Sequence, residues 1–245
     1  MYEDLTPELA RKIQFRFRQI MDHNSGIQAI TKKIRAGKAT QMDVNKYADF
    51  VGKAGSAAMK QVLQLDALPD GTMYEEIARD TITPVMEDMW KDVNTQAALQ
   101  LRADDRVKGI NIGIRSGFEP KKRIDDVVQM MAGQTSQVAL DNAMTDPVIT
   151  TAQKFLDDFK MENADLRQEL GFDIIVRRIY DDRGLHNGKT PCTWCLARQG
   201  RFSLAEAHAQ GVFNRHPGCS CIIIYDTPEK TQVQTDWTRN EWSDV

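Results

Sequence analysis

The chain has 245 residues, of which 41% are hydrophobic and 27% charged, and its formal net charge is −3. This length suffices for one large domain or two small ones, and the composition allows an apolar core. A slightly acidic chain has no overall attraction to nucleic acid, and no apolar run approaches the roughly 20 residues of a membrane span. The first residues lack a basic-then-apolar pattern, so we expect no signal peptide, no membrane contact and a reducing compartment at synthesis.

The first two-thirds of the sequence predicts helices. Thr6 followed by Pro7 is typical of a helix start, and apolar residues recur after it at helical spacing. Asn24 interrupts this helix, and a second helix follows. Thr40 and Asp43 resemble a capping box, which predicts the start of a third and longer helix.

A fourth helical run is expected over residues 72–103. Pro84 lies inside this run and predicts a kink or a break near residues 82–83. Residues 104–119 lose the helical pattern, and we interpret them as a connection between two helical halves. Helical character then resumes and extends, with interruptions, to about residue 170.

After this helical region, the sequence pattern changes from that of helices to that of strands. Residues 172–180 are rich in β-branched side chains and predict a strand, and residues 221–225 predict a second. Between them, Ser203 and Glu206 form another capping-box pattern, which predicts a short helix over about 203–210. We expect the two strands to pair.

All four cysteines lie within residues 192–221, together with two histidines, His208 and His216. The pattern is C-x-x-C, a spacer of twenty residues, then H-x-x-C-x-C. Two ligands three positions apart on a tight turn can converge on one ion, and tetrahedral zinc takes four such ligands. The sequence therefore predicts a structural Zn²⁺ site, with candidate ligands Cys192, Cys195, His216, Cys219 and Cys221.

Two questions about this site stay open. A disulfide or redox pair, or unligated thiols, would also fit, because C-x-x-C occurs in redox proteins. The fourth ligand is also undecided, although the spacing favours Cys219 over Cys221.

The fold class that follows is mainly α, with a helical N-terminal body and a small zinc-stapled α+β module, in which zinc cross-links the loop between two strands. A module of this size is marginal for an independent core, and structural zinc contributes about 10–16 kcal/mol of apparent binding free energy. The expected division is a helical body over 1–170, the zinc-binding module over 171–226 and a polar C-terminal tail over 227–245.

The sequence contains only parts of known catalytic motifs. Pro191-Cys192-x-x-Cys195 matches half of the zinc-deaminase pattern, but neither His186 nor His23 is followed by the required glutamate. Four or five protein ligands would also leave no open coordination position for catalysis. We predict that the protein is not an enzyme.

Basic residues cluster on the predicted helices, around Arg11, Lys32 and Lys121. A solvated helix face explains such clusters. Contact with nucleic acid or with an acidic protein surface stays open.

The cysteine-rich stretch resembles the C-terminal region of minor capsid (head morphogenesis) proteins of tailed bacteriophages. The similar residues are Cys192-x-x-Cys195, Gly200-Arg201-Phe202 and the run Asn214-Arg215-His216-Pro217-Gly218-Cys219-Ser220-Cys221-Ile222-Ile223-Ile224-Tyr225. In that family, a helical region precedes C-x-x-C, a spacer, and H-x-x-C-x-C leading into a strand. The specific match covers roughly 172–226, and Ser220 stands where the family usually has arginine.

The resemblance implies a structural component of the virion, made in the host cytoplasm and placed in the phage head. It would contact the portal protein and/or the major capsid protein. Self-association and contact with packaged DNA stay open. The alternative is a zinc-knuckle nucleic-acid-binding protein with a helical scaffold.

Overall fold

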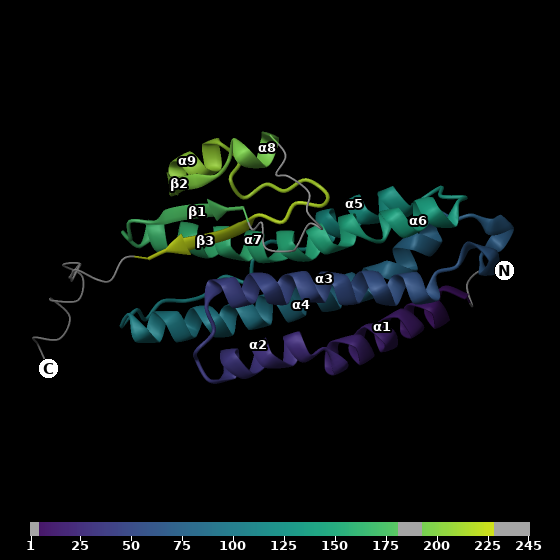
Figure 1. Ribbon diagram of the computed structural model, residues 1–245, viewed down its shortest axis with the longest axis horizontal. Helices are drawn as coiled ribbons and strands as arrows, with labels where there is room; N and C mark the ends of the chain where they lie inside the picture. The colour runs from purple at the N-terminus through teal and green to yellow at the C-terminus, as the bar shows by residue number, and fades with distance from the viewer. Residues whose placement is uncertain (1–4, 181–192, 228–245) are drawn as a thin grey trace, which may run out of the picture.

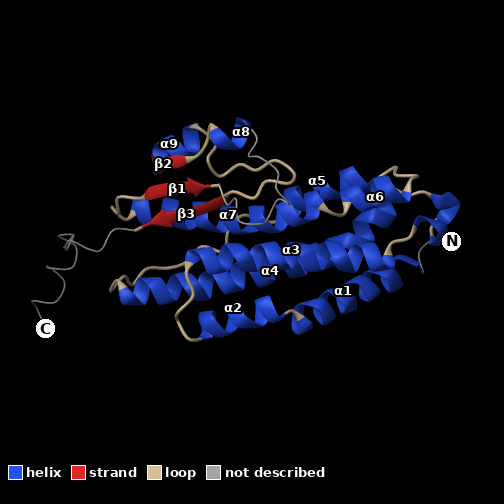
Figure 2. Ribbon diagram, in the orientation of Figure 1, coloured by secondary structure: helices blue, strands red, loops and turns tan. Residues whose placement is uncertain are grey.

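The computed structural model describes residues 5–180 and 193–227. The chain is mainly α-helical and carries a small antiparallel sheet near its C-terminal end, which confirms the predicted fold class (Figure 2). The predicted polar tail lies outside the described residues, apart from Thr227.

Long helices form the body of the molecule, with two short 3-10 helices between the third and the fourth. Their bounds are α1 (Leu5–His23), α2 (Ser25–Arg35), α3 (Gln41–Val62), η1 (Leu65–Ala67), η2 (Pro69–Gly71), α4 (Glu75–Val107), α5 (Lys121–Met131), α6 (Gln137–Ala143) and α7 (Asp146–Glu169). The irregular segment 108–120 separates α4 from α5, close to the predicted connection.

The helix starts follow local sequence signals. The Thr40 side chain accepts a hydrogen bond from the Asp43 amide while the Asp43 carboxylate accepts one from the Thr40 amide, so the predicted capping box opens α3. Asn24 caps α2 through its side-chain oxygen, which accepts from the amide of Ile27.

Of the kink or break predicted at Pro84, the break does not occur, because α4 continues from Glu75 to Val107 through this proline. Proline inside a helix removes one backbone hydrogen bond and costs about 3 kcal/mol. Ile82, Val85 and Met86 beside it are fully buried, so tertiary packing of this turn outweighs the local cost.

The helices pack in layers around α3, which contacts α1, α4 and α7. Figure 1 shows α1 and α2 on one side of the α3–α4 layer, and α7 with α5 on the other. A Cβ atom at Gly52 of α3 would lie 2.7 Å from the Cα of Ile149. Glycine at this position therefore allows α3 and α7 to approach closely.

We call the part of the chain from the first to the last strand the C-terminal module. This module lies on α7 (Figure 1). Its elements are β1 (Ile175–Ile179), α8 (Thr193–Leu196), β2 (Gly200–Ser203), α9 (Leu204–Ala209) and β3 (Ile222–Asp226). The sheet order is β2-β1-β3 and both pairings are antiparallel, so the two predicted strands do pair. Val176 of β1 lies opposite Phe202 of β2 and Tyr225 of β3.

The apolar core runs from the helices into the module without a break. Val176, Val212 and Ile223 belong to the same buried cluster as the bundle residues, and β3 packs against α3 and α7. A second buried cluster is separate from this core and consists of Cys195, Cys219 and Cys221.

In the described part of the chain, no helix combines the length and the apolar character needed to cross a membrane.

Candidate metal centre

The structure brings together three of the predicted ligands, Cys195, His216 and Cys219. Their ligand atoms all lie within 4.8 Å of one another. The Cys195 Sγ is 3.0 Å from the His216 Nε2 and 3.7 Å from the Cys219 Sγ. This Cys-His-Cys group could hold a metal ion.

Two short segments position these ligands. Cys195 lies on the single turn of α8, and its side chain points into the module, where it is 3% exposed. His216 and Cys219 lie on the turn that leads toward β3, where the Cys219 amide donates to the His216 carbonyl at 3.1 Å. Gly218 within this turn has a φ of +74°, a conformation that favours glycine.

The His216 ring is oriented by a backbone carbonyl. Its Nδ1 lies 2.8 Å from the Pro217 oxygen, a distance at which the Nδ1–H donates. This leaves the lone pair of Nε2 directed toward Cys195, as in metal sites where the second ring nitrogen binds a carbonyl.

The surroundings of Cys219 favour its thiolate. The pKa of Cys219 is lowered, first because the Cys221 thiol donates a hydrogen bond to it and then because Arg215 and Arg178 lie nearby. The Arg178 Nη2 donates to the Cys219 Sγ at 3.4 Å. Since metals bind the deprotonated thiol, these contacts prepare Cys219 as a ligand.

Cys221 is buried beside Cys219, but it is outside the group of three converging ligands. The pKa of Cys221 is raised, mainly by its hydrogen bond to Cys219. The spacing argument that favoured Cys219 thus agrees with the geometry, and ligation by Cys221 stays a prediction. Cys192 lies outside the described residues, so its role also stays a prediction.

Arg215, next to His216, connects the metal-site turn to α7. Its Nε and Nη2 donate to the Asp157 carboxylate, and both side chains are 1% exposed. Its Nη1 donates to the Gln153 side chain at 2.9 Å and to the Cys221 carbonyl at 2.6 Å. Burial of an ion pair costs desolvation, which these additional hydrogen bonds offset.

Arg178 of β1 connects the sheet to the same turn. It is 1% exposed and lies on the inward face with Val176, as the alternation of a strand requires. Its Nη1 donates to the carbonyls of Val212 and Asn214, in addition to the contact of Nη2 with Cys219. Arg178 therefore supports a ligand and the loop that carries it.

Trp194 covers one side of the cluster. The guanidinium carbon of Arg198 lies 4.0 Å from its ring centroid and that of Arg178 lies 5.0 Å away. The His216 ring meets it edge-on, with centroids 5.5 Å apart. Trp194 thus packs against the buried cysteines and is held by two cations and one ring.

The sequence reasoning missed the burial of Arg178 and Arg215, and it missed the partners of Arg215 on α7. The alternation Val176-x-Arg178 in a predicted strand was a signal for an inward arginine. Nothing local marks Arg215, because its partner Asp157 is far away in the sequence.

Comparison of the chain with protein-family models, with curated proteins and with solved structures found no match.

Proposed function

We propose that the protein is a structural, non-enzymatic minor capsid protein of a tailed-phage head, in which a structural Zn²⁺ holds the C-terminal module on the helical body. The helices would supply surfaces for the portal protein and/or the major capsid protein. The convergence of Cys195, His216 and Cys219 at one point supports this proposal most directly, since these residues carry the resemblance.

Zinc is the metal that suits this donor set. Thiolates with an imidazole are typical ligands of structural zinc, and sulfur ligands around a tetrahedral zinc lie about 3.8 Å apart. The observed 3.7 Å between the sulfur atoms of Cys195 and Cys219 agrees with this spacing. Cys192 or Cys221 would provide the fourth ligand.

The zinc would act as a cross-link. It would connect α8 to the turn before β3, and Arg215 would connect that turn to α7. The position of the sheet on the helical body would then depend on the metal as well as on apolar packing.

Ion pairs within the basic clusters weaken the alternative of a nucleic-acid-binding protein. Many of their cations pair with carboxylates, which leaves fewer charges for phosphate contact. The pairs are Lys12–Glu8, Arg18–Asp92, Lys33–Asp43, Lys122–Asp126 and Arg123–Asp158.

The test is incorporation into particles. Cys195→Ser should unfold the metal-site segment and prevent the protein from joining phage heads, as measured in purified particles. Leu196→Ser is the matched control, because it places serine at an exposed position of the same helix and should be incorporated normally. Normal incorporation of Cys195→Ser would overturn the proposal.

A further inference from the structure

The two ends of the long axis of the molecule carry opposite charge. Figure 1 shows η1, η2 and the start of α4 toward one end, and the α2–α3 connection with the last turns of α4 toward the other. α4 joins the two ends, so about 45 Å of helix separates Glu76 near its start from Arg106 near its last residue.

The basic end lies where α2 and α4 stop. We define it by the exposed residues Lys32, Arg35, Lys38 and Arg106. None of them forms an ion pair with a residue in the described ranges 5–180 and 193–227. A Cβ atom at Gly37 would lie 3.8 Å from the Cβ of Ala103, so the α2–α3 connection lies against α4 one turn before Arg106.

Carboxylates close to the basic end do not neutralise it. The sequence has no acidic residue over 25–42. Asp43, which follows, pairs with Lys33. Asp104 of α4 is half-buried and accepts a hydrogen bond from Gln100. The positive charge of the basic end therefore faces solvent.

The acidic end lies around η1, η2 and the first turns of α4. We define it by the exposed residues Asp66, Asp70, Glu76 and Asp80. The sequence has no lysine, arginine or histidine over 61–78. Arg79, the first cation after this stretch, already pairs with Glu75 and Asp125. This end therefore keeps its negative charge.

Helix dipoles explain only part of this arrangement. Acidic residues at the start of a helix and cations at its end are stabilising, but the effect falls off within the first and the last turn. Asp66 and Asp70 precede α4, and Lys38 follows the end of α2. These charges therefore need another explanation.

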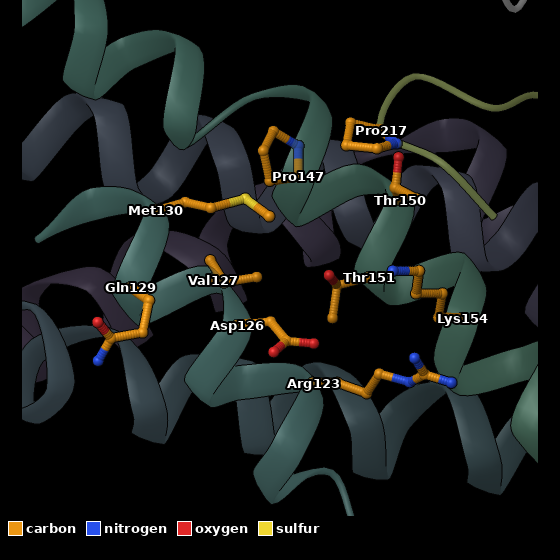
Figure 3. A pocket seen from close by; sticks show the side chains of 10 residues that line it. All are labelled: Arg123, Asp126, Val127, Gln129, Met130, Pro147, Thr150, Thr151, Lys154 and Pro217. Carbon is orange, nitrogen blue, oxygen red and sulfur yellow. The ribbon is translucent and has the colours of Figure 1, made fainter. Parts of the chain in front are cut away.

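Between the two ends, opposite charges lie side by side. Figure 3 shows Arg123, Asp126 and Lys154 around one pocket between α5 and α7. Arg123 pairs with Asp158, Lys122 pairs with Asp126, and Lys154 lies near both carboxylates. The separation of charge is thus a property of the ends.

The two ends can attract each other only between molecules. The separation of about 45 Å is several times the Debye length of about 8 Å at physiological ionic strength. Each end also exposes an apolar side chain, since Val107 beside Arg106 is 84% exposed and Tyr74 beside Glu75 is 44% exposed. A contact between the ends would bury apolar surface as well as pair charges.

We propose that copies of this protein associate head to tail, with the basic end of one copy on the acidic end of the next. Each copy in such a contact keeps one end free, so the association continues into a closed ring or an open chain. The proposal depends neither on the metal ligands nor on the capsid assignment, because it uses only the charges at the two ends.

Sedimentation velocity of the purified full-length protein tests the proposal. At about 0.1 M salt, the mass should rise beyond that of a dimer as the concentration increases from about 10 μM to about 1 mM. At about 1 M salt, where the Debye length is about 3 Å, the protein should be monomeric.

Two double variants reverse the charge of one end each. Arg35→Glu with Arg106→Glu changes the basic end, and Glu76→Lys with Asp80→Lys changes the acidic end. Each variant alone should associate at least about tenfold more weakly than the unchanged protein, because like charges then meet.

An equal mixture of the two double variants should associate again, because each supplies the end that the other lacks. This recovery also shows that both variants are folded. The matched control is Lys91→Glu with Lys121→Glu, which reverses two exposed charges outside both ends and should associate as the unchanged protein does.

Four results would overturn the proposal. They are a protein that stays monomeric up to about 1 mM, association that does not grow beyond a dimer, association that persists at about 1 M salt, and a mixture of the two variants that stays monomeric. A monomeric protein whose basic end binds a short DNA duplex, with binding lost in the Arg35→Glu, Arg106→Glu variant, would instead assign that end to phosphate groups.

Discussion

The helical body and the C-terminal module bury different chemistry. The body buries mainly aliphatic, aromatic and methionine side chains, such as Ile13, Phe17 and Met86, with the ion pair of Arg167 and Asp105 as an exception. At the contact between the module and α7, the buried groups are arginines, a carboxylate, a lysine and thiols. Apolar packing is tolerant and local, whereas buried charges require particular partners.

α7 belongs to both regions. Its apolar residues, including Phe155 and Leu156, join the main core. Gln153, Asp157 and Lys160 lie at spacings of four and three, which places them along one face of the helix. This buried polar face receives Arg215 and the carbonyl of Ile223, so the module is positioned on the helix by hydrogen bonds as well as by contact area.

The largest effect is expected where this polar contact is broken. Arg215→Met would leave the Asp157 carboxylate buried without its partner, and the free energy of unfolding should fall by about 3–5 kcal/mol in a urea titration. Arg102→Met is the control, because Arg102 is exposed on α4, and its effect should be small. A loss below about 1 kcal/mol for Arg215→Met would show that the ion pair is not important for stability.

A core substitution in the helical body tests whether the apolar core is independent of the metal group. Ile13→Ala removes a fully buried side chain of α1 and should lower the free energy of unfolding by about 2–5 kcal/mol. Because Ile13 is remote from the metal group, the loss should be equal with and without a chelator. A loss that depends on the chelator would contradict the separation of the two regions.

Lys160, which lies in this polar contact, predicts that the stability of the protein depends on pH. Burial lowers its pKa to about 7, an effect that Asp157 partly opposes and Arg215 reinforces. Between this value and the ordinary lysine pKa near 10.4, the unfolded chain binds a proton that the folded chain lacks. The stability should therefore rise with pH in this window, by up to about 1.4 kcal/mol per pH unit.

The control for this effect is Lys160→Met, in which the rise above about pH 7 should be reduced relative to the unchanged protein. Urea titrations at several pH values measure both slopes. Identical slopes in the two proteins would mean that Lys160 is charged in the folded state.

The smallest effect is expected at the helix caps. Thr40→Ala in α3 and Ser203→Ala in α9 each remove the side chain of a capping box, and each should cost about 1 kcal/mol. Hydrogen exchange should locate the loss in the first turn of the affected helix. A cost at Ser203 several times that at Thr40 would mean that α9 contributes more to the module than its local cap.

The sequence predicted well those features that depend on near neighbours. Both capping boxes, the helical segments before residue 170 and the pairing of the two main strands are present as expected. His216 and Cys219 share one turn because their spacing is a local property, whereas Cys195 reaches them from α8.

The features that sequence reasoning missed depend on distant partners. Gln153, Asp157 and Lys160 have the polar spacing of a solvated helix face, yet the folded protein buries all three. β2 has four residues and an arginine among them, too short a pattern to predict a strand. Pro84 disfavours a helix locally, and the packing of its neighbours reverses that preference.

The central claim is that a zinc ion at Cys195, His216 and Cys219 fixes the C-terminal module on α7. Metal analysis of the purified protein, combined with hydrogen exchange before and after chelation, tests it most directly. We predict about one zinc per chain. Chelation should speed exchange of the module amides while those of α1, α3 and α4 stay protected. A protein that contains no zinc and exchanges identically in chelator would contradict the claim.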